Sequence, residues 1–341
     1  MAFEAIQSLV AWTIERVPDR VAVECPHGLL TYAELDVRAD DVAVSLQRAG
    51  VRPASPVVLL AEDRREFVAG LLGVLRVGGV AIPLDPVTDP GMLRRVVAGL
   101  GRRTAAVVGS GERQLAERVL SGPAPDVAVH VPCTAGVSGR GGPYVRRPVP
   151  GDPCCAFPTG RGRRTAVRTL GSVDHDIRRV VGLLRAGTGC RVSQLGPLAT
   201  DTMLRDVFVP LTCGGTVCVP PTSVRWDGAA MRRWIHDEWI TVVHAGPVTL
   251  RLLLDAPAAG RPEFPALRQV VLDGEEPTAA DARRWHHLFG DRVPLVHFHG
   301  STVAMAPCRT TGPTAGHTEA TGAPALAPPD RVPGSHRADV A

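Results

Sequence analysis

A predicted helix-to-strand connection occupies Leu75-Arg76-Val77-Gly78-Gly79-Val80-Ala81-Ile82-Pro83-Leu84-Asp85-Pro86. The apolar run 80–84 predicts a strand, and residues 65–77 before it predict a helix. A further predicted strand over 57–61 precedes that helix. This strand-helix-strand order is typical of a mainly parallel sheet that helices cover on both faces.

The same alternation of helices and strands continues along most of the chain. Thr31 and Glu34 form a capping box at the start of one helix, and Gly50 is a candidate residue for its end. The expected helices span 3–16, 31–50, 65–77, 90–99, 112–120, 173–185, 203–212, 229–239, 248–255 and 278–289. The expected strands span 57–61, 80–84, 105–108, 127–131, 154–157, 191–195, 216–219, 240–244, 268–272 and 294–298. The chain is therefore predicted to be an α/β protein.

Two stretches interrupt the alternation and suggest a domain organisation. Residues 134–152 are rich in Gly, Pro and Arg, as a connection between lobes would be. After Pro307 the chain is mostly Ala, Gly, Pro and Thr without periodicity, which predicts a poorly ordered tail. We expect a first α/β lobe over 1–150, a second over 151–306 and a loosely ordered tail over 307–341.

The basic residues of the chain are all arginine. None of the 341 residues is lysine, so the 38 basic residues are arginines. The chain therefore supplies no Schiff-base lysine and no lysine on a nucleotide phosphate. Arginine binds a phosphate with a planar fork, but it does not replace the compact, flexible point charge of lysine at a tight site.

Composition excludes several classes of protein. A net charge of +4, spread along the chain, and 4% aromatic residues argue against a nucleic-acid-binding face. Every apolar run is too short to span a membrane, and the N-terminus lacks the pattern of a secretory signal. The eight cysteines form no CxxC pair, and Cys154 and Cys155 are predicted to be buried core residues. The expected location is the cytoplasm.

Three motifs resemble the adenylate-forming superfamily, and specifically the amino-acid adenylation domains of nonribosomal peptide synthetases. They are Pro18-Asp19-Arg20-Val21-Ala22-Val23, Leu30-Thr31-Tyr32-Ala33-Glu34-Leu35 and the segment 75–86 quoted above. The resemblance covers roughly residues 5–306. It implies two adenylation-type lobes with mainly parallel sheets, without the C-terminal lobe of the family. It also implies ATP and Mg²⁺ as cofactors and carrier-protein or synthetase domains as partners.

The phosphate-binding loop of the family is only partly matched. The resemblance places it at Phe157-Pro158-Thr159-Gly160-Arg161-Gly162-Arg163-Arg164-Thr165, which lacks most of the family's hydroxyls and its lysine. Thr159, Gly160 and Gly162 are the candidate phosphate contacts, because backbone N–H groups of such a turn bind anions. The alternative interpretation is a solvated basic loop.

The resemblance also places a substrate site. Asp201 takes the position of the aspartate that binds the α-ammonium group of the substrate, although an aspartate there also suits a helix N-cap. The other pocket positions fall on Thr202, Arg205, His244, Val271, Asp273 and Phe298. This polar lining suits a small polar or charged amino or carboxylic acid. Alternatively, Arg205 and Asp273 pair with each other and fill the pocket.

Two further motifs concern the nucleotide. Leu272-Asp273-Gly274-Glu275-Glu276-Pro277 resembles the element that lies along the adenine, so Gly274 and Glu275 are candidate nucleotide contacts. His299, Gly300 and Thr302 stand in the following nucleotide motif. The family glutamate that holds Mg²⁺ is replaced by Val303, which offers the metal no oxygen. The sequence therefore assigns no catalytic residue and no metal ligand.

Three functions fit these patterns. The first is a degenerate, stand-alone adenylation-like protein of nonribosomal peptide or related secondary metabolism that cannot adenylate alone but binds an amino acid or a nucleotide. The second is an active amino-acid-adenylating ligase with a partner that supplies the missing parts. The third is a non-catalytic docking protein for carrier or synthetase domains. A zinc site at His297, His299, His286, His287 and Cys308 is a further, separate alternative, although the spacing matches no compact zinc motif.

Overall fold

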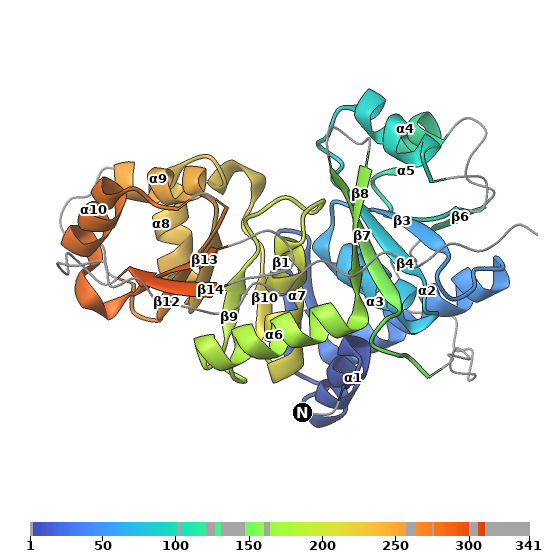
Figure 1. The fold of residues 1–341 in the computed structure, drawn as a ribbon, viewed down its shortest axis with the longest axis horizontal. Coiled ribbons are helices and arrows are strands. Elements are labelled where there is room, and N and C mark those ends of the chain that lie inside the picture. The colour runs from blue at the N-terminus through green and yellow to red at the C-terminus, as the bar shows by residue number, and fades with distance from the viewer. Residues whose placement is uncertain are drawn as a thin grey trace, which may run out of the picture.

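The computed structural model describes residues 3–100, 104–120, 127–130, 147–159, 164–256, 264–274, 276–299 and 306–310. Two sheets lie side by side, with helices between them and on their outer faces (Figure 1). In this described part, no helix is both long and apolar enough to cross a membrane. The predicted α/β class with two mainly parallel sheets flanked by helices is confirmed.

The six-stranded sheet contains the segment from which the sequence analysis began. Its strands are, in spatial order, β6 (Val127–His130), β5 (Ala105–Val108), β3 (Pro56–Leu60), β4 (Val80–Leu84), β7 (Pro153–Thr159) and β8 (Arg164–Thr169). Neighbouring strands are parallel except at the β7–β8 edge, which is antiparallel. The parallel order explains why β4 is apolar on both faces: all five of its residues are buried.

The eight-stranded sheet contains most of the strands of the second half of the chain. Its strands are, in order, β14 (Ala306–Thr310), β13 (Leu295–His299), β12 (Gln269–Asp273), β11 (Val242–Ala245), β9 (Arg191–Ser193), β10 (Thr216–Cys218), β1 (Val21–Cys25) and β2 (Gly28–Thr31). The pairs β13–β14 and β1–β2 at the two edges are antiparallel, and the pairs between them are parallel.

Each sheet contains strands from both halves of the chain. The hairpin β1–β2 lies early in the sequence but extends the sheet of the second half, whereas β7–β8 follows residue 150 and extends the sheet of the first half. The expected division at residues 150 and 151 therefore does not coincide with the division between the sheets, and lobes made of continuous chain segments remain a prediction. Strands β1, β2, β8 and β14 were not expected from the sequence.

Helices form three layers around the two sheets. The middle layer consists of α1 (Ile6–Arg16), α2 (Tyr32–Arg48), α3 (Arg64–Arg76), α6 (Leu170–Leu184) and α7 (Thr202–Cys213), whose buried side chains form one core with the inner faces of both sheets. The outer layers are α4 (Pro90–Ala98) with α5 (Arg113–Leu120), and α8 (Gly228–Asp237) with α9 (Pro247–Asp255) and α10 (Ala279–Phe289). Short 3₁₀ turns cover Thr222–Val224 (η1) and Gly290–Arg292 (η2).

The start and end of α2 follow from local sequence. Thr31 accepts the N–H of Glu34, and the Glu34 carboxylate accepts the N–H of Thr31 at 2.8 Å, which is the predicted capping box. At the other end, Gly50 has φ +82°, and the N–H groups of Gly50 and Val51 bond to the carbonyls of Gln47 and Leu46. This is a Schellman ending, in which the left-handed conformation favours glycine.

Replacing Thr31 with alanine should lower the free energy of unfolding by about 1 kcal/mol, because the first turn of α2 loses its side-chain acceptor. Urea unfolding followed by circular dichroism measures the change. Ser223→Ala, at an exposed residue of η1, is the matched control and should leave stability unchanged. Equal midpoints for the two variants would contradict a stabilising role of the cap.

Candidate adenylation-type site

The start of α7 carries the first candidate substrate contact. Asp201 occupies the N-cap position, but its side chain caps no backbone N–H of the helix. Its Oδ2 instead lies 3.5 Å from Nη1 of Arg168, a buried guanidinium that also pairs with Asp176. Asp201 is therefore the N-cap residue of α7, as the alternative interpretation expected, but its side chain does not accept the expected backbone hydrogen bond. Asp201 is 24% exposed, so its carboxylate is open to a ligand.

Arg205 and Asp273 form the ion pair that the sequence left as an alternative. Arg205 Nη2 lies 2.5 Å from Asp273 Oδ1, and the two side chains are 3% and 14% exposed. Arg205 Nη2 also lies 3.5 Å from Thr202 Oγ1, and the guanidinium carbon lies 5.6 Å from the centre of the Phe298 ring. Asp273 and Phe298 are neighbours in the β12–β13 register. Four of the expected pocket residues thus come together.

His244 has a partner that the sequence analysis missed. Its Nδ1 makes a short hydrogen bond with the carboxylate of Asp206, and both side chains are almost fully buried. Burial raises the pKa of Asp206, while His244 is the main influence that lowers it. The available signal was a second charged residue directly after Arg205 in an otherwise apolar helix, but its partner lies 38 residues away.

These side chains form one polar cluster, defined as Thr202, Arg205, Asp206, His244 and Asp273. Asp206 interacts electrostatically with Asp273 and Arg205 as well as with His244. Within the described residues, Asp206 Oδ2, His244 Nε2 and Asp273 Oδ2 of the cluster are buried and have no hydrogen-bond partner. Buried polar atoms are rarely left unsatisfied, so they indicate a place for a polar ligand or water.

The expected nucleotide contacts are only partly described. Thr159 is the exposed last residue of β7, and Gly274 follows β12 with φ +95°. The Gly274 carbonyl lies 3.1 Å from His297 Nε2. His299 ends β13, but its side chain is not among the described ones. Gly160, Gly162, Glu275, Gly300 and Thr302 lie outside the described residues.

The expected zinc ligands do not form a described group. His297 is buried, whereas the side chains of His299 and Cys308 are not described, so this hypothesis stays a prediction. Cys154 and Cys155 are buried in the shared core, as expected. Among the described side chains, one group of Cys, His and Asp residues has metal-ligand spacing, and it lies elsewhere, at Cys25, His27 and Asp63.

Comparison with known proteins assigns the chain to a family. The profile of AMP-binding enzymes matches residues 10–134 and 165–331. Nonribosomal peptide synthetase 8 of Aspergillus fumigatus is 27% identical over 333 residues, which are 90% of this chain and 4% of that protein. Phosphinothricin tripeptide synthetase PhsC of Streptomyces viridochromogenes is 28% identical over 279 residues, which are 79% of this chain and 24% of that protein.

Solved structures agree with the sequence relatives. The crystal structure of the nonribosomal peptide synthetase FmoA3 has a TM-score of 0.78 at 26% identity and covers 90% of this chain, which spans 33% of FmoA3. VinN in complex with L-aspartate has a TM-score of 0.75 at 19% identity, covers 88% of this chain and shares the fold. The chain thus spans a small part of the curated synthetases that it matches. It belongs to the AMP-binding enzyme family and is adenylation-like, with relatives among the nonribosomal peptide synthetases.

Proposed function

We propose that this chain is a degenerate adenylation-like protein of nonribosomal peptide or related secondary metabolism, which binds a polar amino acid but does not adenylate it alone. The observation that carries the proposal is the polar cluster with its unsatisfied buried atoms. A ligand side chain with both a donor and an acceptor would satisfy atoms that apolar packing leaves unpaired.

Asp201 supports recognition of the α-ammonium group. Its carboxylate shares the guanidinium of Arg168 with Asp176, and Asp176 makes the shorter contact. Two carboxylates against one guanidinium leave net negative charge, which favours a ligand cation. Asp201 also lies on the same first turn of α7 as Thr202 of the polar cluster, so one small ligand could contact both.

The chain's own residues argue against adenylation without help. A developing negative charge on the phosphates requires preorganised cations, and the chain has no lysine to take the place of the family's lysine, whose compact point charge arginine does not reproduce. We propose no Mg²⁺ ligand, because Val303 stands where the resemblance places the glutamate that holds the metal, and valine offers no oxygen. The proposal therefore contains no metal-dependent step.

The nucleotide and the partner proteins are proposed only from the similarity of this chain to known proteins. FmoA3 has been solved in an AMPPNP-bound form at 27% identity and a TM-score of 0.75. We propose ATP as a second ligand, with Thr159 and Gly274 as its described contacts. Carrier-protein or synthetase domains are proposed as partners because the relatives are synthetases.

The proposal is tested by calorimetric titration of the full chain with polar amino acids, with Mg·ATP and with a non-hydrolysable aminoacyl-adenylate analogue. We expect one polar amino acid to bind and no amino-acid-dependent pyrophosphate exchange. Asp201→Ala should weaken amino-acid binding by roughly 10- to 100-fold, because a charged hydrogen bond to the ligand is lost. Asp19→Ala, at an exposed aspartate, is the control and should bind normally.

Two results would overturn parts of the proposal. Exchange activity of the isolated chain would show that it adenylates without help. Failure of a folded sample to bind any amino acid or adenylate analogue would remove the ligand-binding function and favour docking to other proteins.

A further inference from the structure

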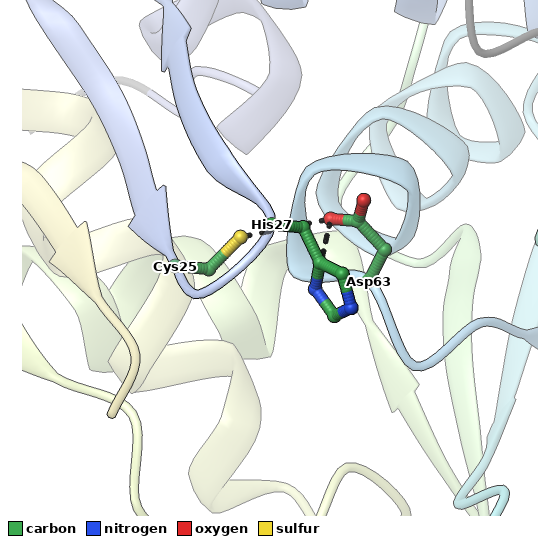
Figure 2. A group of neighbouring side chains, drawn as sticks. All are labelled: Cys25, His27 and Asp63. Carbon is green, nitrogen blue, oxygen red and sulfur yellow. Dashed lines mark hydrogen bonds and ion pairs between the residues drawn. The ribbon is translucent and has the colours of Figure 1, made fainter. Parts of the chain in front are cut away.

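Three potential metal ligands lie together at the N-terminal end of α3, namely Cys25, His27 and Asp63. Cys25 ends β1, His27 lies in the turn before β2, and Asp63 is the N-cap residue of α3 (Figure 2). Their ligand atoms all lie within 4.8 Å of one another. The three residues belong neither to the polar cluster nor to the expected nucleotide contacts.

The spacing of these atoms suits a tetrahedral ion. Asp63 Oδ1 lies 3.6 Å from Cys25 Sγ and 3.9 Å from His27 Nδ1. In a tetrahedral zinc site, with sulfur at about 2.3 Å and oxygen or nitrogen at about 2.0 Å from the metal, neighbouring ligand atoms are roughly 3.3–3.5 Å apart. Small side-chain rotations would therefore bring all three atoms to coordination distance.

We propose that Cys25, His27 and Asp63 form a binding site for a zinc-type divalent cation. A thiolate, an imidazole and a carboxylate together suit zinc, whereas magnesium and calcium prefer oxygen ligands alone. Three protein ligands leave one coordination position for water. A cavity of about 70 Å³ has room for that water, and its lining includes Cys25 and His27 together with the charged residues Glu62, Asp85, Arg64 and Arg225.

The surrounding residues hold the carboxylate in place. Arg65 Nη2 donates to Asp63 Oδ2 at 2.6 Å. Asp63 Oδ1 accepts the backbone N–H of Arg65 at 2.9 Å and Arg65 Nε at 3.2 Å, and it faces Cys25 and His27. A carboxylate oriented by a second residue is the usual support for a metal ligand. Gly28 permits this arrangement, because a Cβ there would lie 2.9 Å from Arg65 Nη1.

The positive charge of Arg65 opposes a cation, and the cysteine must lose its proton. The ion would join the β1–β2 hairpin of one sheet to α3, which packs on β3 and β4 of the other.

The test uses the full chain, stripped with a chelator and titrated with Zn²⁺ against a chromogenic competitor. We expect one equivalent to bind, and Co²⁺ substitution to produce a sulfur-to-metal charge-transfer band. Cys25→Ser should abolish that band, and Cys25→Ser and His27→Gln should each weaken binding at least about tenfold. Asp63→Asn is unsuitable as the main variant, because Asp63 also caps α3.

Matched controls separate this site from casual binding by other cysteines and histidines. Cys213→Ser and His236→Gln alter a partly exposed thiol and an exposed imidazole elsewhere, and should change neither stoichiometry nor affinity. Thermal unfolding without metal shows whether each variant is folded. Equal Zn²⁺ affinity of folded Cys25→Ser and Cys213→Ser, or a cobalt complex without a sulfur band, would overturn the proposal.

Discussion

Replacing His244 with alanine should lower the free energy of unfolding by about 3–5 kcal/mol, because it leaves the carboxylate of Asp206 buried without its partner. The side chains of His244 and Asp206 are 1% and 0% exposed, so bulk solvent does not compensate for the lost hydrogen bond. Chemical denaturation monitored by tryptophan fluorescence measures the loss. His236→Ala, at an exposed histidine, is the matched control and should cost little.

The same variant should have a distinctive pH dependence. Burial already raises the pKa of Asp206, and removal of His244 takes away the main influence that lowers it. In the folded variant, the Asp206 carboxyl group then keeps its proton at pH values where the same group of the unfolded chain has released it. Stability therefore falls as pH rises from the ordinary carboxyl range towards neutrality, and the loss relative to the unmodified chain grows. A loss independent of pH would contradict an uncompensated carboxylate as the cause.

A double replacement distinguishes the pair from simple cavity formation. Asp206→Leu combined with His244→Leu removes both polar groups and restores apolar volume, so it should recover most of the stability that His244→Ala loses. It should also abolish binding of a polar amino acid if the polar cluster contacts the ligand. Full ligand affinity in a folded double variant would place the ligand elsewhere.

Phe208→Ala is the second replacement with a large expected effect. Phe208 is completely buried on α7, in the core that the two sheets share. Truncation removes most of an aromatic side chain and leaves a cavity, which typically costs about 3–5 kcal/mol. Urea unfolding gives the change in free energy.

Two further variants serve as comparisons for Phe208→Ala. Phe208→Leu should lose less, because leucine fills more of the space than alanine does. Val37→Ala, on the exposed face of α2, should leave stability nearly unchanged. Similar losses for Phe208→Ala and Val37→Ala would show that α7 does not contribute to a common core.

Local patterns were enough to predict most of the elements. The strand Val80–Leu84, the strand Ala105–Val108 and the capping box of α2 agree with the structure because each depends on residues that are close in sequence. The hairpin β1–β2 was missed, although its strands are short and apolar. Its partner β10 lies almost 200 residues away, and no local pattern identifies such a partner.

The candidate site shows the same limit. Resemblance brought Thr202, Arg205, His244 and Asp273 into one expected pocket, and the structure brings them together. It did not identify Asp206 as the partner of His244 or Arg168 as the partner of Asp201. Both contacts join residues at or in the start of α7 to side chains of β11 and β8, which are distant in sequence.

Residue order alone settled most of the alternation of helices and strands and the absence of lysine, since these are properties of single residues and short segments. Tertiary structure decided how strands are shared between the sheets, which charges neutralise one another and where Cys25, His27 and Asp63 meet. The physical reason is that such contacts form only when the apolar faces of distant segments are buried together. The hydrophobic periodicity of a helix or strand predicts which of its faces is buried, but not which other segment packs against that face.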